Sequence, residues 1–322
     1  MKSLKLLGRV IVVVGSLLNL TGAVWAEQAP LRLLVGYPAG GSADAAARAL
    51  EAPLSKALNR SVVIDNRPGA GGMIAAQALK SMPPDENTVL LVNDHMVAMI
   101  PWTMKNPGYD AVRDFASLGQ VAKFNMVLGV SNGSGINSAA EYLARAKADK
   151  LVAVYGVPAP ASTFQFAGYV LGKSQSVDLS SVPYKGSAPL VADLMGNQLP
   201  AGISTVTDMV EGHKAGKLKV LAIAGKTRSG LLPDVQTFAE LGFKGLDRDS
   251  FIGFYAPAKT SQKFITEFTE ALRVVMTQEE VRGRFMKLGF EPAYATPKAF
   301  ADNVAADKDY WGGVVKASGF QP

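Results

Sequence analysis

Apolar runs of strand length alternate with helix-forming segments along almost the whole chain. The first apolar run covers residues 31–35, proline and glycines break it before residue 42, and helix formers follow over residues 45–58. Further strand candidates cover residues 61–65, 89–92, 121–130, 151–155, 219–224 and 250–255. This alternation predicts an α/β fold in which mainly parallel sheets are flanked by helices.

The turn after the first strand carries the features of an anion site. Ser42 is a good N-cap residue, Asp44 falls in the first turn of the predicted helix, and Pro53 is expected to kink or divide that helix. A strand that enters a helix through glycines leaves main-chain N–H groups unpaired and aimed at one point. That point attracts a carboxylate or a phosphate. A second strand–glycine–helix unit over residues 61–80 places ligands at the carboxyl ends of parallel strands.

Two long strand candidates, over residues 121–130 and 250–255, bracket a central segment that has its own strands and helices. The economical interpretation is that the chain crosses twice between two lobes. We expect lobe 1 to comprise residues 27–125 and 254–322, and lobe 2 to comprise residues 126–253. A ligand cleft is expected between the lobes, because ligands often bind there and hinge closure around them is common.

The N-terminus has the pattern of an export signal. Lys2, Lys5 and Arg9 precede an apolar core over residues 10–18, and cleavage is expected after Ala26. The apolar core is short for a membrane span, which favours a cleaved signal over the alternative, an uncleaved N-terminal anchor. We therefore expect a signal peptide over residues 1–26 and an exported protein.

The amino-acid composition excludes several classes of function. The 322 residues include no cysteine, which excludes disulfides, thiol catalysis and cysteine metal sites. The net charge of +6 comes from charges of both signs mixed along the chain. Such a surface does not predict nucleic-acid binding.

The chain carries few of the groups that enzymes use. Its two histidines are His213, in a polar segment, and His95, which follows a strand candidate and is interpreted as a hydrogen-bonding residue rather than a base. Ser42 and Ser162 have no obvious base partner, and the Gly-x-Ser-x-Gly and His-Glu-x-x-His patterns are absent from the sequence. We therefore predict no catalytic residue, metal ligand or cofactor. An exported hydrolase or isomerase that uses the cleft is the alternative.

Three motifs, taken in order, resemble one family. They are Tyr37-Pro-Ala-Gly-Gly-Ser-Ala-Asp44, Asp65-Asn-Arg-Pro-Gly-Ala-Gly-Gly72 and Val182-Pro-Tyr-Lys-Gly-Ser-Ala-Pro189. This ordered set resembles the substrate-binding proteins of tripartite tricarboxylate transporters, also called the Bug (Bordetella uptake gene) family. Further matches, such as Leu232-Pro-Asp-Val-Gln-Thr237, extend the resemblance over nearly the whole chain after residue 26.

The resemblance implies a two-lobed periplasmic binding protein of type II, a "Venus flytrap". It implies a periplasmic location, a small carboxylate, amide or aromatic acid in the cleft, and no cofactor. It also implies delivery of that ligand to a separate membrane permease. We expect a monomer that binds no nucleic acid. A periplasmic sensor that signals to a membrane partner is the alternative.

The resemblance further implies that two loops hold the ligand, namely the Pro-x-Gly-Gly loop of lobe 1 and the loop after the strand that ends at Tyr155. The predicted ligand-binding residues are Tyr37, Pro38, Ala39, Gly40, Gly41, Ser42, Asp44, Asn93, Asp94, His95, Gly156, Val157, Ala161, Ser162, Thr163, Phe164 and Tyr184.

The second loop departs from the pattern of the family. Pro158 and Pro160 cannot donate a main-chain hydrogen bond, so two donors are missing where the family often grips a second carboxylate. We hypothesise that the ligand carries one carboxylate, bound mainly at the first loop, and a less polar second end, as in a monocarboxylate or an aromatic acid. Val157, Phe164 and Phe166 are candidates to face that end, and the alternative is that they pack in the core of lobe 2.

Overall fold

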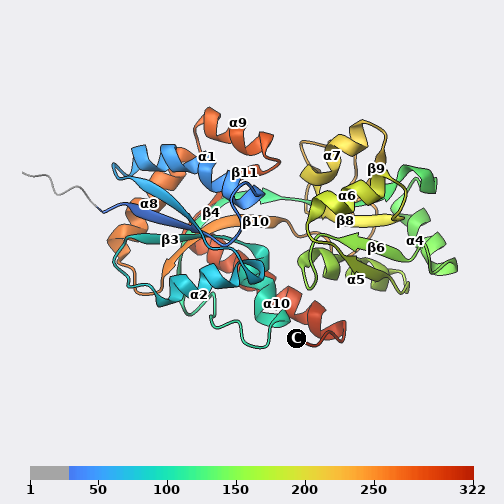
Figure 1. Cartoon of the computed structure of the whole chain (residues 1–322), viewed down its shortest axis with the longest axis horizontal. Helices are drawn as coiled ribbons and strands as arrows, with labels where there is room; N and C mark the ends of the chain where they lie inside the picture. Colours follow the sequence, from blue (N-terminus) through green and yellow to red (C-terminus); the bar gives the residue numbers. More distant parts are fainter. Residues whose placement is uncertain (1–28) are drawn as a thin grey trace, which may run out of the picture.

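A computed structural model describes residues 29–322, which form two lobes joined side by side (Figure 1). Each lobe is built on one β-sheet with helices packed against both faces. The predicted two-lobed α/β fold is therefore confirmed. The predicted signal peptide lies outside the described residues. Within residues 29–322, no helix is long and apolar enough to cross a membrane.

Lobe 1 contains a six-stranded sheet in the order β11-β4-β10-β3-β1-β2. Its strands are β1 (Leu31–Val35), β2 (Val62–Asn66), β3 (Thr88–Asn93), β4 (Phe115–Phe124), β10 (Ser250–Pro257) and β11 (Glu291–Ala295). Its helices are α1 (Ser42–Ala57), α2 (Met73–Ser81), α3 (Ile100–Thr103), α8 (Gln262–Val275), α9 (Glu279–Lys287) and α10 (Pro297–Ala317). Apolar side chains of α1, α8 and α9 cover one face of the sheet, and those of α2 and α10 cover the other.

Lobe 2 contains a five-stranded sheet in the order β7-β6-β8-β5-β9. Its strands are β5 (Met126–Ser131), β6 (Val154–Val157), β7 (Ser180–Pro183), β8 (Ala201–Thr205) and β9 (Leu218–Ile223). Its helices are α4 (Ala139–Ala148), α5 (Thr163–Ser174), α6 (Ser187–Met195) and α7 (Val206–Lys214). Helices α4 and α5 pack on one face of this sheet, and α6 and α7 pack on the other.

Both sheets are mixed rather than mainly parallel. Strand β1 runs parallel to β2 and β3, and β6 runs parallel to β7 and β8, as predicted for strand–helix–strand units. In contrast, β10 is antiparallel to β3 and β4, and β5 is antiparallel to β8 and β9. Strands β5 and β10 each follow a crossing between the lobes. At these crossings the chain leaves the sheet of lobe 1 after β4 and returns to it, in the opposite direction, as β10.

The two crossings lie beside each other. The predicted strand over residues 121–130 is two strands, β4 and β5, which belong to different sheets and meet at Asn125. The return crossing ends at Ser250, because all of β10 pairs in the sheet of lobe 1, so the expected boundary at residue 254 falls inside that strand. Asn125 Nδ2 donates to Asp249 Oδ1 at 3.1 Å, which ties the outgoing chain to the returning chain.

Helix α1 starts one residue earlier than the capping pattern suggests, and it is not divided. Gly41 is its N-cap, so Ser42 is its first helical residue. The helix continues through Pro53, where the sequence predicted a kink or a break. Leu50 and Leu54, on either side of that proline, are fully buried in the core of lobe 1, and their packing outweighs the local preference.

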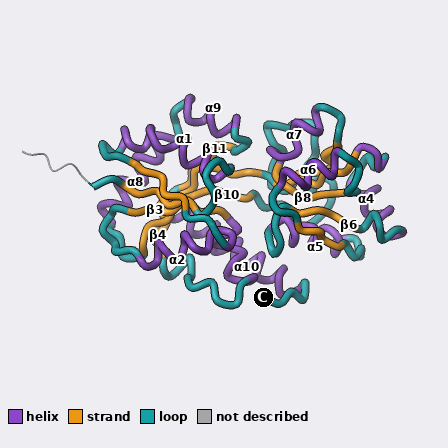
Figure 2. Tube along the Cα trace, viewed as in Figure 1, coloured by secondary structure: helices purple, strands orange, loops and turns teal. Residues whose placement is uncertain are grey.

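The C-terminal helix α10 belongs to both lobes. Its first half places Phe300 and Val304 in the core of lobe 1, and its second half places Trp311 and Val315 in the core of lobe 2. In Figures 1 and 2 the helix runs below the junction between the lobes. Near its end, Tyr169 of α5 donates its hydroxyl proton to the carbonyl of Ala317 at 2.7 Å. Helix α10 is therefore a third link between the lobes, in addition to the two crossings.

We expect Trp311→Ala to lower the free energy of unfolding by about 3–5 kcal/mol, because it leaves a large cavity where α10 packs into lobe 2. Urea denaturation followed by circular dichroism measures the change. Asp309→Ala on the exposed side of the same helix is the matched control and should stay within about 0.5 kcal/mol of the parent. Equal losses in the two variants would contradict this role for Trp311.

Candidate functional site

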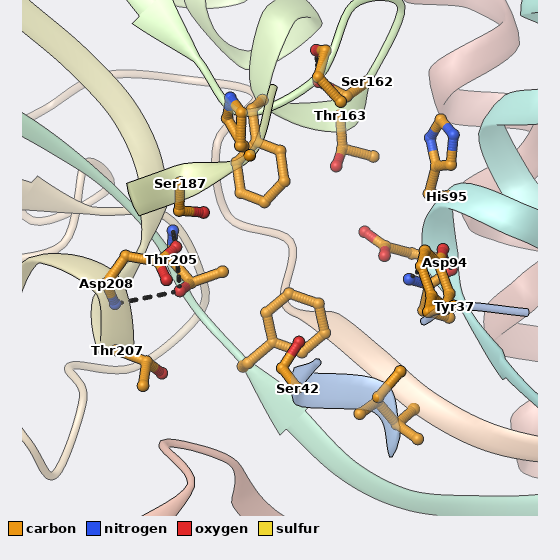
Figure 3. A pocket seen from close by; sticks show the side chains of 18 of the residues that line it. Tyr37, Ser42, Asp94, His95, Ser162, Thr163, Ser187, Thr205, Thr207 and Asp208 are labelled. Carbon is orange, nitrogen blue, oxygen red and sulfur yellow. Dashed lines mark hydrogen bonds between the residues drawn. The ribbon is translucent and has the colours of Figure 1, made fainter. Parts of the chain in front are cut away.

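A cavity of about 420 Å³ lies between the lobes, at strand ends and helix starts (Figure 3). Lobe 1 contributes the carboxyl ends of β1 and β3, the start of α1 and the segment after α9. Lobe 2 contributes the starts of α5, α6 and α7. Parallel strands and the helices that follow them therefore bring residues distant in sequence to one place.

The structure brings one part of the predicted set together at this cavity. The predicted residues that line it are Tyr37, Ser42, Asn93, Asp94, His95, Ser162, Thr163 and Phe164. The predicted residues that do not line it are Pro38, Ala39, Gly40, Gly41, Asp44, Gly156, Val157, Ala161 and Tyr184.

Other lining residues were missed by the sequence analysis. They are Ala43, Gly71, Leu91, Phe124, Pro158, Ala159, Gly186, Ser187, Thr205, Thr207, Asp208, Ile252, Leu288 and Phe290. Two signals could have found some of them: Thr205-x-x-Asp208 is a capping-box pattern, and Ser187 lies inside a motif that carries the family resemblance. No local signal marks Leu288 or Phe290, because they reach the cavity only through the tertiary fold.

Asp44 organises the first loop instead of facing the cavity. Its carboxylate accepts hydrogen bonds from Arg48 Nε at 2.8 Å, from the Gly40 amide at 2.9 Å and from Asn66 Nδ2 at 3.0 Å. Burial alone would raise the pKa of Asp44, but these hydrogen bonds outweigh it and lower the pKa. The amides of Gly40 and Gly41 are occupied within the loop, since Gly41 donates to the carbonyl of Pro38 at 3.3 Å. The donors left for a ligand are the next amides, at the start of α1.

Four helices begin at the cavity, and three of them lack a capping side chain. Gly41 and Gly186, the N-caps of α1 and α6, have no side chain to offer. Ser162, the N-cap of α5, donates its hydroxyl proton to the carbonyl of Ala159 at 2.7 Å instead of capping the helix. The first-turn amides of these helices therefore keep their hydrogen-bonding capacity, and the helix dipoles add positive potential there.

Several other helices of the protein do have the capping side chain that α1, α5 and α6 lack. Among the other helices, α4, α8 and α10 are capped by Ser138, Ser261 and Thr296, whereas α2, α3 and α9 have no capping side chain. The fourth helix at the cavity, α7, has a complete capping box: the Asp208 amide donates to Thr205 Oγ1 and the Thr205 amide donates to Asp208 Oδ2, each at 3.3 Å. Thr205 Oγ1 and Ser204 Oγ also donate to Asp208 Oδ2, so this oxygen is engaged within lobe 2.

A closed set of hydrogen bonds fixes the wall at the ends of β1 and β3. Asn93 Nδ2 donates to the Tyr37 hydroxyl oxygen at 2.8 Å, and that hydroxyl donates to the carbonyl of Gly71 at 3.1 Å. Asn93 Oδ1 accepts from the Met96 amide at 3.1 Å. Tyr37 and Asn93 thus position one another and the segment around Gly71.

Asp94 and His95 follow directly in the chain and have fewer partners. Asp94 accepts a hydrogen bond from Ser250 Oγ at 2.7 Å. Burial raises the pKa of Asp94 to about 7, the charge of Asp307 adds to the rise, and the hydrogen bond from Ser250 opposes it. Burial lowers the pKa of His95 to about 4, so its imidazole is neutral at pH 7. Its Nδ1 is buried without a hydrogen-bond partner among the described residues.

Apolar side chains form the rest of the wall. Phe124, Phe164, Leu288 and Phe290 line the cavity. Of the three apolar residues considered for a less polar end of the ligand, only Phe164 is at the cavity. Val157 and Phe166 are almost fully buried in the core of lobe 2, so the alternative interpretation holds for them.

The cavity lining offers no cationic side chain, and the described residues offer no metal cluster. None of the residues that line the cavity is a lysine or an arginine. Within residues 29–322, no group of three or more His, Cys, Asp or Glu side chains could hold a metal ion. Binding of an anion in this cavity therefore depends on neutral donors.

The lobes touch at one edge of the cavity. Thr207, at the start of α7, donates its hydroxyl proton to the carbonyl of Gly289 at 3.4 Å. Gly289 has a φ of 78°, and a Cβ atom at this position would lie 1.9 Å from Thr207 Oγ1. Only glycine allows this close approach between lobe 1 and lobe 2.

We expect the stability difference between Asp94→Asn and the parent to depend on pH. An aspartate in the unfolded chain loses its proton near pH 4, whereas the native Asp94 keeps its proton until about pH 7. The parent should therefore lose about 1.4 kcal/mol of stability relative to Asp94→Asn for each pH unit between those values, and nothing further above them. Urea denaturation at several pH values measures this. A difference between Asp94→Asn and the parent that stays constant with pH would disprove the assignment.

We expect Gly289→Ala to force the lobes apart at the Thr207 contact, because the new Cβ has no room and the positive φ is strained. Small-angle X-ray scattering should show a larger radius of gyration. Gly283→Ala is the matched control, because a Cβ there meets nothing within 4 Å. It should leave the radius unchanged and stabilise α9 by up to about 1 kcal/mol. Identical scattering from both variants would contradict the contact.

Comparisons with known sequences agree over most of the chain. The sequence model of the family described as "Tripartite tricarboxylate transporter family receptor" matches residues 46–320. The UPF0065 protein of the gbd 5'region of Cupriavidus necator is 33% identical, over 86% of this chain and 84% of its own length. The protein BugT of Bordetella pertussis is 28% identical, over 90% of this chain and 89% of its own length.

Solved structures have the same architecture. A protein of R. palustris solved with adipate superposes with a TM-score of 0.81 at 28% identity, covering 92% of this chain and 99% of that one. The periplasmic binding protein BugD gives a TM-score of 0.76 at 28% identity, covering 91% of this chain and 98% of that one. The resemblance predicted from the motifs is confirmed, and the chain belongs to the family of tripartite tricarboxylate transporter receptors, which includes Bug-type proteins.

Proposed function

We propose that this protein is an extracytoplasmic solute-binding protein that captures a small carboxylic acid in the cavity between its lobes. It then delivers the acid to the membrane permease subunits of a tripartite tricarboxylate-type transporter. In this proposal the chain is exported by its N-terminal signal, works in the periplasm as a monomer, and uses no cofactor.

The convergence of uncapped helix starts carries the proposal. The first-turn amides of α1, α5 and α6 are available from two lobes around one cavity. Hydroxyl groups add to them, since Ser42 and Thr163 make no side-chain hydrogen bond within the described residues and Ser187 keeps its proton free to donate. Main-chain amides at helix starts bind carboxylates well, and no cation is needed for this.

The relatives support an organic acid as the ligand. The R. palustris protein that shares this fold at 28% identity was solved with adipate, a small carboxylate. The apolar wall of Phe124, Phe164, Leu288 and Phe290 suits the hydrocarbon part of such a molecule. We further propose that the acid carries a single carboxylate, because Pro158 at the second loop brings no main-chain donor.

The arrangement favours binding over turnover. Among the described residues, His95 accepts no proton from a serine or threonine hydroxyl, and its buried Nδ1 has no partner. The hydroxyl of Ser162 is directed to the carbonyl of Ala159. These residues therefore do not form the nucleophile–base pair that acyl transfer requires.

The experiment starts with a thermal-shift screen of small carboxylic acids. An acid at 100 times its dissociation constant adds about 2.7 kcal/mol of stability, which is a shift of several degrees. The best acid is then titrated by calorimetry against Ser42→Pro and Ser42→Ala. Proline fits the first helical position after the extended Gly41 and removes the amide proton, whereas alanine removes only the hydroxyl. We expect Ser42→Pro to bind about 10- to 100-fold more weakly than Ser42→Ala.

Thr163→Pro with Thr163→Ala, and Ser187→Pro with Ser187→Ala, repeat the comparison at the first positions of α5 and α6. Equal affinities within all three pairs would show that main-chain amides do not hold the acid. Loss of uptake of the same acid in cells that lack this protein tests the delivery step.

A further inference from the structure

The polar groups of the cavity are separated into a donor side and an acceptor corner. On the donor side lie the first-turn amides of α1, α5 and α6 and the hydroxyls of Ser42, Thr163 and Ser187. The acceptor corner is Asp94 and His95, at the end of β3. Figure 3 shows the Asp94 carboxyl group directed into the open space, opposite Ser187 and Thr205.

Two other side-chain acceptors around the cavity are engaged by partners within their own lobe. Asp208 Oδ2 receives hydrogen bonds from Ser204 Oγ at 2.5 Å and from Thr205 Oγ1 at 2.8 Å. Asn93 Oδ1 receives the amide of Met96 at 3.1 Å. Asp94, in contrast, directs its carboxyl group into the open space.

Asp94 has capacity to spare. Its side chain is 4% exposed, and Ser250 is the only side chain among the described residues that donates to it. The main-chain amides of Asp94 and His95 also donate to this carboxyl group. A carboxylate offers about four acceptor sites, so these donors leave room for one that a ligand supplies. A buried carboxyl group that lines a ligand cavity gains most from a donor supplied by the ligand itself.

His95 lies next to Asp94, and the backbone at Gly71 leaves space for its ring. Its ring packs against Gly71, where a Cβ atom would lie 2.6 Å from Nε2, and Gly71 has a φ of 67°. A glycine is therefore needed there to admit the ring. Its neutral imidazole presents one acceptor nitrogen and one N–H group, and none of the described residues uses either.

We propose that Asp94 and His95 form a second recognition point, which selects acids whose far end carries a hydrogen-bond donor: an amine, an amide or a hydroxyl. This inference rests on the proposed function, in which the helix starts hold the carboxylate end. When Asp94 is ionised, the corner also acts against a second carboxylate, because the two negative charges would face each other in a buried site. The ligand class is therefore an amino, amide or hydroxy acid with an apolar middle.

Two matched series of acids test the ligand end. One is butanoate, 4-hydroxybutanoate, 4-aminobutanoate, succinamate and succinate, and the other is benzoate, 4-hydroxybenzoate, 4-aminobenzoate, 4-carbamoylbenzoate and terephthalate. Within each series the carboxylate is constant and only the far group changes. Calorimetry on the full mature protein should give affinities at least tenfold higher for at least one donor-bearing acid than for both the plain acid and the dicarboxylate. Comparison of the hydroxy, amino and amide acids within each series shows which donor group the protein prefers.

Asp94→Asn tests the protein end, with the exposed Asp178→Asn as the matched control for loss of one carboxylate. Asp94→Asn should lower the ratio of the affinity for the donor-bearing acid to the affinity for the plain acid at least tenfold. Asp178→Asn should leave this ratio unchanged. The selectivity of the parent protein is a measurement that needs no variant, so it decides the question even if Asp94→Asn folds poorly.

The outcomes separate the two proposals. If plain acids or dicarboxylates bind as tightly as the donor-bearing acids, the corner is not a recognition point, although the proposed carboxylate binding stands. If the donor-bearing acids are preferred and Asp94→Asn keeps that preference, Asp94 is not its source, and the inference fails. If no acid of a broad library binds, the proposed function itself fails.

Discussion

The proposed binding site depends on main-chain N–H groups that have no hydrogen-bond partner among the described residues. Three helices begin at one cavity without a capping side chain, and the cavity wall holds no lysine or arginine among its described residues. Elsewhere in the chain, Ser138, Ser261 and Thr296 satisfy such groups locally. Unpaired amides at the cavity cost stability, and an anion bound as we propose would recover it. Because these amides come from both lobes, such an anion would also link the lobes.

The surrounding residues hold these amides in place. Asp44 fixes the first loop through Arg48, Gly40 and Asn66, and it does so without taking part in the cavity. The crossings between the lobes lie beside each other at Asn125, and α10 runs from one core into the other. The lobes are thus joined by two crossings and by α10, and the Thr207–Gly289 contact joins them at the cavity edge.

Much of this organisation could be predicted from local sequence. The strand–glycine–helix pattern placed Ser42 beside an anion site, the strand candidates indicated two lobes, and the ordered motifs indicated the family. The sequence analysis could not show which amides are free, because Gly40 and Gly41 are occupied only once the loop folds around Asp44. It also missed Leu288 and Phe290, whose approach to lobe 2 depends on packing between residues far apart in the chain. Burial of Val157 in a core, rather than at the cavity, likewise depends on the tertiary fold.

The division between main-chain donors and a side-chain corner affects how such a protein can diverge. A point mutation replaces a side chain but leaves the backbone amide in place unless it introduces proline. The proposed binding of a carboxylate by main-chain amides therefore tolerates most substitutions around α1, α5 and α6. Asp94 and His95, in contrast, can be replaced by single codon changes, and the main-chain amides that would bind the carboxylate remain in place. Gene duplication followed by mutation at that corner would yield receptors with new ligand specificities on an unchanged fold.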